Sequence, residues 1–213
     1  MTRVKICGIT SPEDAVECAS SGADAIGMLV DVEISPRRIT VEEARQIVSA
    51  LPPFVASVIV MTPSTPDNVI EAVKKVQPAA VQLHGDEPAD MLWQIRRQLP
   101  GVKLIKTIHV GEGDEIEKAR RYESAADAIL LDTSSPLGGG AGIVHDWTIS
   151  RKIIDTVRLP VILAGGLSPK NVRDAVKATH PYAVDACSGV EAKKREKDLR
   201  LVQEFIRQAK VIT

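Results

Sequence analysis

Short apolar runs of strand length alternate with amphipathic helical segments along the whole chain, and this alternation constrains the fold more than any other feature. About eight strand–helix units follow one another at spacings of roughly 20 to 30 residues. Strands are expected at residues 4–7, 23–30, 54–61, 79–84, 102–108, 128–131, 159–164 and 182–187. Helices are expected at residues 11–21, 40–51, 66–76, 87–99, 114–122, 147–156, 169–177 and 197–210.

Strands that are each followed by a helix form a parallel sheet, which is either open or closed into a barrel. The number of units suits closure, and 213 residues are close to the minimum for a (β/α)8 barrel. An open sheet is less favoured, because the first strand is not followed by the G-x-G-x-x-G sequence of a dinucleotide-binding sheet. We therefore predict an α/β protein in which residues 1–213 form a single (β/α)8 TIM barrel domain.

The overall charge and the cysteines exclude several classes of protein. The formal net charge is −1 with both signs interspersed, so no surface for nucleic acid or an anionic membrane is expected. Cys7, Cys18 and Cys187 are odd in number and widely spaced, which argues against a disulfide framework or a zinc site. The chain has no signal-peptide apolar region and no run of bilayer length, so we expect a protein of the reducing cytoplasm.

Cys7 ends the first predicted strand, and the carboxyl ends of parallel strands are where α/β proteins handle ligands. Gly8 follows it, and the hydroxyls of Thr10 and Ser11 are suited to cap the helix that Pro12 begins. A free cysteine is also often a small apolar packing residue, and this alternative stays open.

Polar side chains end two further strands. Gln82 and His84 end the fourth strand, and Asp132 directly follows the apolar run 128–131. Asp132 is either a functional carboxyl group or a cap for the loop that follows. Residues 138–142 include four glycines, which suits a loop that closes over a ligand, with simple flexibility as the alternative.

Small residues at the ends of the last two strands predict a phosphate site. Gly165 and Gly166 follow the seventh strand, and Ser188 and Gly189 follow the eighth. Backbone N–H groups at these two turns can converge on an anion, as they do in the recurrent phosphate site of barrel enzymes. Glycine turns also occur without ligands.

Arg37 follows the second strand, where a guanidinium group could bind a substrate carboxylate through two hydrogen bonds. Because Arg38 stands beside it, a solvated surface arginine is the better interpretation from spacing alone. His109 and His145 also lie near strand ends, but the sequence shows no ligand-like grouping around them. His180 is expected on the opposite rim of the barrel and is assigned no chemistry.

An ordered set of motifs runs from Val4 to Glu191. These are Lys5-Ile6-Cys7-Gly8-Ile9-Thr10, Ser35-Pro36-Arg37, Val81-Gln82-Leu83-His84-Gly85, Leu131-Asp132, Gly139-Gly140-Ala141-Gly142 with Asp146-Trp147, Ala164-Gly165-Gly166-Leu167 and Val184-Asp185-Ala186-Cys187-Ser188-Gly189-Val190-Glu191. One motif would be weak evidence, but together they resemble the phosphoribosylanthranilate isomerase family of tryptophan biosynthesis.

The resemblance implies an acid/base Amadori rearrangement of N-(5-phosphoribosyl)anthranilate to 1-(2-carboxyphenylamino)-1-deoxyribulose 5-phosphate, the third step of tryptophan synthesis from chorismate. It implies that Asp132 is the general acid for the furanose ring oxygen and that Cys7 is the general base for the C2 proton. A positioned acid and base need no metal or organic cofactor, so none is expected. We expect the helix N-terminus after Gly8 to lower the pKa of Cys7, and burial to raise the pKa of Asp132.

The resemblance also implies how the substrate is held. Arg37 would bind the anthranilate carboxylate, Asp185 would line the anthranilate side, and the two glycine turns would hold the phosphate. The substrate-binding candidates are Arg37, Gln82, His84, Asp185, Gly165, Gly166, Ser188 and Gly189. The only partner expected is this small phosphosugar, with the chain as a monomer or a homodimer.

The chain departs from the usual family pattern at Met28, residues 143–145, Cys187 and residues 194–195, without loss of a catalytic group. One rival hypothesis is a different sugar-phosphate isomerase on the same barrel. Such enzymes resemble designs with two paired aspartates, whereas this chain has a thiol at the end of its first strand. Another is a non-catalytic barrel that binds a phosphometabolite, which would need neither Cys7 nor Asp132.

Overall fold

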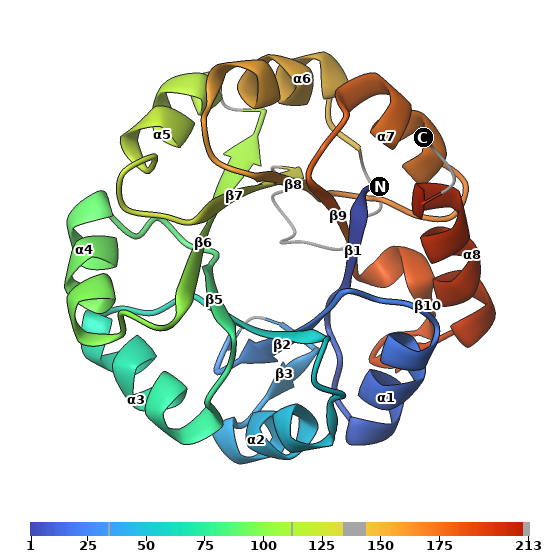
Figure 1. Ribbon diagram of the computed structural model, residues 1–213, viewed down its shortest axis with the longest axis horizontal. Helices are drawn as coiled ribbons and strands as arrows, with labels where there is room; N and C mark the ends of the chain where they lie inside the picture. The colour runs from blue at the N-terminus through green and yellow to red at the C-terminus, as the bar shows by residue number, and fades with distance from the viewer. Residues whose placement is uncertain (34, 112, 134–143, 211–213) are drawn as a thin grey trace.

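The computed structural model describes all residues except 34, 112, 134–143 and 211–213. Eight parallel strands form a closed barrel, and helices surround it as an outer ring (Figure 1). The barrel strands are β1 (Arg3–Ile6), β2 (Ala25–Val30), β4 (Ala56–Met61), β5 (Ala80–Leu83), β6 (Lys103–Val110), β7 (Ala128–Thr133), β8 (Val161–Leu163) and β9 (Ala183–Ala186). The helices are α1 (Pro12–Ser20), α2 (Val41–Ala50), α3 (Pro66–Val76), α4 (Ala89–Gln98), α5 (Glu115–Arg121), α6 (Trp147–Thr156), α7 (Val172–Thr179) and α8 (Leu199–Lys210).

The barrel closes because β1 pairs in parallel with both β2 and β9. This closure confirms the predicted (β/α)8 barrel and excludes the open sheet. Local sequence sets several helix starts: Ser11 accepts a hydrogen bond from Asp14 N, and Thr40 and Thr65 each form a reciprocal capping box. No helix in the described part of the chain is both long and apolar enough to cross a membrane.

Alternation along the strands divides the hydrophobic core into two layers. One set of side chains packs between the barrel and its helices, including Val4 and Ile6 of β1. A smaller set fills the barrel interior, including Val58, Ile105 and Leu130. Successive residues of a strand point to opposite faces, so Lys5 and Cys7 share the inward side of β1.

The structure corrects several boundaries. The expected strand at 54–61 begins at Ala56, because Phe54 lies in a turn and is 99% exposed. A short strand, β3 (Arg38–Ile39), pairs in parallel with the end of β2 where a loop was expected. Residues after the last barrel strand form a 3-10 turn, η1 (Ser188–Val190), and an antiparallel pair, β10 (Glu191–Lys193) and β11 (Glu196–Lys197), so α8 begins two residues later than expected.

Candidate active site

Cys7 lies at the carboxyl end of β1, inside the rim of the barrel. Its backbone N–H donates to Ala186 O at 2.8 Å, and its side chain is only 6% exposed. Gly27 of β2 makes room for it, since a methyl group placed there would lie 2.8 Å from Cys7 Sγ and 3.0 Å from Lys5 Nζ. Both polar groups therefore crowd against one glycine in the neighbouring strand.

A buried ion pair lies one layer below Cys7. Lys5 Nζ is 2.9 Å from Asp185 Oδ2, and the two residues are directly paired between β1 and β9. Burial alone would lower the pKa of Lys5, but the Asp185 carboxylate raises it on balance, so the amine stays protonated. A fixed positive charge thus stands beside the Cys7 thiol.

The pKa of Cys7 is lowered to about 7 by a hydrogen bond with the Cys187 side chain and by the Lys5 charge, against the opposing effect of burial. The same contact and burial raise the pKa of Cys187, so Cys7 is the thiol of this pair that ionises first. α1 begins at Pro12 as expected, and the effect of its N-terminus on the pKa of Cys7 stays a prediction. The lower pKa comes from the neighbouring strand and from Lys5.

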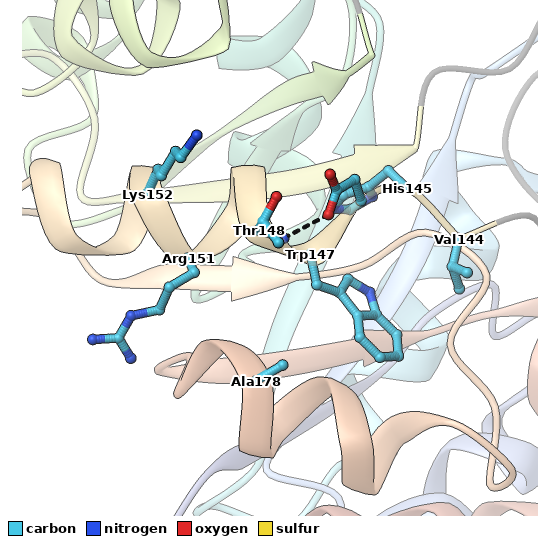
Figure 2. A pocket seen from close by; sticks show the side chains of 8 residues that line it. Val144, His145, Trp147, Thr148, Arg151, Lys152 and Ala178 are labelled. Carbon is cyan, nitrogen blue, oxygen red and sulfur yellow. Dashed lines mark hydrogen bonds between the residues drawn. The ribbon is translucent and has the colours of Figure 1, made fainter.

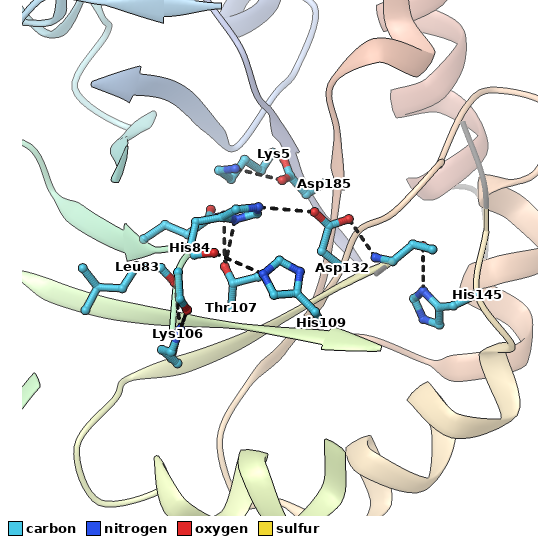
Figure 3. Close-up of polar contacts among 12 residues, drawn as sticks. Lys5, Leu83, His84, Lys106, Thr107, His109, Asp132, His145 and Asp185 are labelled. Atoms are coloured by element: carbon cyan, nitrogen blue, oxygen red, sulfur yellow. Dashed lines mark hydrogen bonds and ion pairs between the residues drawn. The ribbon is translucent and has the colours of Figure 1, made fainter. Parts of the chain in front are cut away.

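Asp132 lies near the end of β7, where burial raises its pKa, as expected from the sequence. Its Oδ1 accepts a hydrogen bond from Thr133 N at 2.9 Å, and its Oδ2 is 3.5 Å from His84 Nε2. Figure 3 shows the carboxyl group of Asp132 facing the ring of His84. A carboxyl group with a raised pKa in this position can supply a proton.

His84 is neutral, because burial and the neighbouring His109 lower its pKa to about 3. Its Nδ1 lies 3.2 Å from both Gln82 Nε2 and Thr107 Oγ1, and with these two groups as donors its proton sits on Nε2, facing Asp132. His109 Nε2 donates to His84 O at 3.1 Å. Side chains from β5 and β6 therefore fix the ring that contacts the candidate acid.

The structure also corrects the prediction that His109 belongs to no ligand-like grouping. Ligand atoms of His84, His109 and Asp132 all lie within 4.8 Å of one another, and the two rings meet edge to face (Figure 3). These three ligand atoms are close enough together to hold a metal ion. Proton transfer between a carboxyl group and a substrate requires no such ion, however, and we treat the cluster as hydrogen-bonding groups.

Arg37 is not the surface residue that its neighbour suggested. Its side chain is 8% exposed and forms a two-pronged ion pair with Glu191, with Nε–Oε1 at 2.7 Å and Nη2–Oε2 at 2.6 Å. Lys197 Nζ also contacts Glu191 Oε1, at 3.1 Å. Gly8 allows this approach, because a methyl group there would lie 2.7 Å from Arg37 Cδ. The loop after β2 is thus joined to the β10–β11 hairpin.

The two glycine turns lie next to each other. Gly165 and Gly166 have φ of +83° and +66°, values that favour glycine. A side chain at Gly189 would overlap the carbonyl of Leu167, so the turn after β9 packs directly on the turn after β8. Ser188 begins the 3-10 turn at this point. The structure brings together the four residues predicted to hold phosphate.

A separate cavity of about 640 Å³ lies beside α6 (Figure 2). Its lining includes Trp147, Arg151 and Ala178, and it contains none of the predicted site residues. His145 contributes to its wall and contacts Thr133 Oγ1 at 3.0 Å, one residue beyond Asp132. The glycine-rich segment predicted to close over a ligand falls in 134–143, outside the described residues.

Sequence reasoning missed several charged, polar and small residues that support the site: Lys5, Gly27, Thr107, Glu191 and Lys197. Lys5 carried a detectable signal, because it is a lysine inside an apolar strand and stands two residues before Cys7, hence on the same face. A glycine within the second strand was a weaker signal of a close approach. Glu191 and Lys197 carried none, since their pairing depends on the hairpin.

A closed parallel barrel that gathers a low-pKa thiol, a high-pKa carboxyl group and two glycine turns at the carboxyl ends of its strands defines a (β/α)8-barrel enzyme. Comparison with known proteins makes the class specific. The sequence matches the family described as N-(5'phosphoribosyl)anthranilate (PRA) isomerase over residues 4–208. The chain belongs to this family and is an isomerase of tryptophan biosynthesis.

Individual relatives agree with this assignment. An N-(5'-phosphoribosyl)anthranilate isomerase of Methanocella arvoryzae is 72% identical over 211 residues, which cover 99% of each chain. The crystal structure of a phosphoribosyl anthranilate isomerase in complex with reduced 1-(o-carboxyphenylamino)-1-deoxyribulose 5-phosphate superposes with a TM-score of 0.87 at 39% identity, covering 100% of both chains. A Thermotoga maritima structure, described as monomers generated from a dimeric isomerase, gives 0.86 at 37% identity and the same coverage.

Proposed function

We propose that this chain converts N-(5-phosphoribosyl)anthranilate into 1-(2-carboxyphenylamino)-1-deoxyribulose 5-phosphate by an acid/base Amadori rearrangement, with Asp132 as acid and Cys7 as base. The observation that carries the residue assignment is the pair of opposite pKa shifts at one barrel mouth. The pKa of Cys7 falls to about 7, and burial raises that of Asp132. Family membership supports the substrate.

The chemistry proceeds in two proton transfers. Asp132 protonates the furanose ring oxygen, which opens the ring to a Schiff base, and the neutral His84 beside it hydrogen-bonds the carboxyl group before and after the transfer. The Cys7 thiolate then removes the C2 proton, and the Lys5 ammonium keeps that sulfur ionised. The enolamine that forms tautomerises to the aminoketose, and proton exchange with solvent returns Asp132 to its acid form and Cys7 to its thiolate. Each group is supplied by this chain.

Substrate binding uses the groups around this pair. Backbone N–H groups of Gly165–Gly166 and Ser188–Gly189 bind the phosphate. Among the described residues, Gln82 Oε1 and Asp185 Oδ1 are buried without a hydrogen-bond partner, which supports a role in binding the substrate. Arg37 receives the anthranilate carboxylate with its donors that Glu191 leaves free.

The deciding experiment follows anthranilate fluorescence as phosphoribosylanthranilate, generated in situ, is consumed. Wild-type protein should remove the substrate catalytically and give the aminoketose, identified by mass spectrometry and reduction. Binding of the substrate without turnover would favour the non-catalytic barrel. Turnover that survives Cys7→Ala but requires Asp132 and Asp185 would favour the rival isomerase with paired aspartates.

We propose a cytoplasmic protein, because three free thiols, two of them in contact inside the site, need a reducing environment. We propose either a monomer or a homodimer, and Phe54, exposed next to the start of β4, marks one apolar position where a second copy could pack. Light scattering of wild type and Phe54→Ser distinguishes these states.

A further inference from the structure

Cys7 and Cys187 are placed side by side by the pairing of β1 with β9. The last register pair is Ile6 with Ala186, so the two cysteines occupy the next position on each strand and point to the same face. Cys7 N donates to Ala186 O, and a methyl group placed at Gly8 would lie 2.7 Å from Cys187 Sγ. The thiol of Cys187 therefore rests against the residue that follows Cys7.

This geometry is compatible with a disulfide. Neighbouring strands lie about 4.7 to 4.9 Å apart, and disulfides join cysteines whose Cα atoms are roughly 4.4 to 6.8 Å apart. The backbone of Cys187 is also held in place, because Lys197 Nζ donates to its carbonyl oxygen at 3.0 Å. Bond formation needs side-chain rotation and no rearrangement of the barrel.

The two cysteines also differ in how readily they ionise, and disulfide formation by peroxide requires one thiolate to react first. Cys7 has Lys5 beneath it, which favours the reactive thiolate, whereas Cys187 is partly exposed and keeps its proton longer. A low-pKa thiol next to a second cysteine is the arrangement of residues that respond reversibly to peroxide. Cys18, by contrast, is fully buried in the outer core layer, away from this mouth.

We propose that Cys7 and Cys187 form a reversible oxidative modification site, in which hydrogen peroxide converts the two thiols into a disulfide. The Cys7 thiolate attacks one peroxide oxygen, the O–O bond breaks, and Cys7 becomes a sulfenic acid as hydroxide leaves and takes up a proton to form water. The Cys187 sulfur then attacks the Cys7 sulfur, the S–O bond breaks, and a second water leaves. Both electrons come from the thiols, and a dithiol reductant reverses the reaction.

The modification removes the base that the proposed function requires. The disulfide should lower the isomerase rate by at least about 10²-fold, the usual loss when a general base is removed. Bound substrate should slow the oxidation, because it covers the barrel mouth. This activity readout rests on the proposed function, whereas formation of the disulfide itself does not.

The test treats the reduced full-length protein with hydrogen peroxide, blocks the remaining thiols with N-ethylmaleimide and maps the products by mass spectrometry. Wild type should lose two hydrogens, give a linked Cys7–Cys187 peptide, and regain its mass and rate with dithiothreitol. Cys18→Ala is the matched control and should behave as wild type. Cys187→Ser should give no disulfide and should instead accumulate a dimedone-reactive sulfenic acid at Cys7.

Two results would overturn the proposal. One is a wild-type protein that passes directly to sulfinic acid at Cys7, with no linked peptide. The other is a disulfide that includes Cys18. If the linked peptide forms but the rate is unchanged, the modification site stands and the assignment of Cys7 as the base fails, so the two proposals are tested separately.

Discussion

Replacing Lys5 by methionine tests whether this buried charge sets the pKa of the catalytic thiol. A methyl group placed on Gly27 would lie within 3.0 Å of both Lys5 Nζ and Cys7 Sγ. These two atoms are therefore at most about 6 Å apart. Two unit charges at 6 Å interact by about 3 kcal/mol at an effective dielectric constant of 20. This energy equals about two pKa units, so the pKa of Cys7 should rise from about 7 to roughly 9.

Lys5→Met should lower kcat/KM at neutral pH, and the loss should disappear at high pH. A base acts when deprotonated, so a higher pKa of Cys7 depletes the active form at neutral pH. The thiolate fraction at pH 7 should fall from about half to about one per cent, which lowers kcat/KM about 50-fold. The ratio of wild-type to variant rates should then shrink toward one as pH rises past 9. A ratio that stays constant across this range would refute the electrostatic role of Lys5.

The same substitution has a cost in stability that must be separated from the kinetics. Lys5→Met leaves the Asp185 carboxylate buried without its partner, which should destabilise the fold by about 3 to 5 kcal/mol in urea unfolding. Adding Asp185→Asn removes that charge and should restore most of the stability.

Further predictions follow from the other site residues. Cys7→Ala and Asp132→Asn should each lower kcat by at least about 10²-fold with smaller changes in KM, measured by anthranilate fluorescence. The falling limb of the wild-type pH profile should lie above the ordinary range of an aspartate, since burial raises the pKa of Asp132 and an acid acts only while protonated; a limb near pH 4 would contradict this. Arg37→Ala should lower kcat/KM by a factor that corresponds to a loss of about 1.5 to 3 kcal/mol in transition-state binding, and Arg37→Lys should recover part of it. Arg38→Ala serves as the exposed control. Gly166→Ala should raise KM and weaken competitive inhibition by inorganic phosphate, at a backbone cost of about 1 to 2 kcal/mol.

Gly166 is a better probe of the phosphate site than Gly189 for a structural reason. A side chain at Gly189 would collide with the backbone of Leu167, so any loss of activity there would combine misfolding with lost binding. Gly166 has a left-handed backbone with φ of +66°, and the cost of a side chain in that conformation can be measured independently by urea unfolding.

The barrel could be predicted because its evidence is local. Each strand and helix carries its own periodicity, and the number of units alone favours closure. The positions of Cys7 and Asp132 followed from the same reasoning, since a polar residue directly after an apolar strand lies at the carboxyl edge. Boundaries were less accurate where short elements such as β3 and β10 depend on pairing with a distant segment.

The electrostatics of the site could not be predicted because they depend on contacts between distant parts of the chain. Arg37 and Glu191 are separated by 154 positions, and the sequence alone made Arg37 look like a surface residue. Lys5 and Asp185 are 180 positions apart and meet only because β1 and β9 pair in this register. Residue types revealed the candidate groups, whereas the register of the paired strands decided which of them form ion pairs.

Burial by itself cannot prepare both partners of an acid/base reaction, because it raises the pKa of every neutral acid. This effect suits Asp132, which must keep its proton, but it would disable Cys7, which must lose one. The barrel resolves the conflict through alternation along one strand: Lys5 stands two residues before Cys7, faces the same interior, and is kept charged by Asp185 on the next strand. The hydrogen bond with Cys187 and one buried lysine together therefore allow a single apolar environment to hold an acid on β7 and a base at the end of β1.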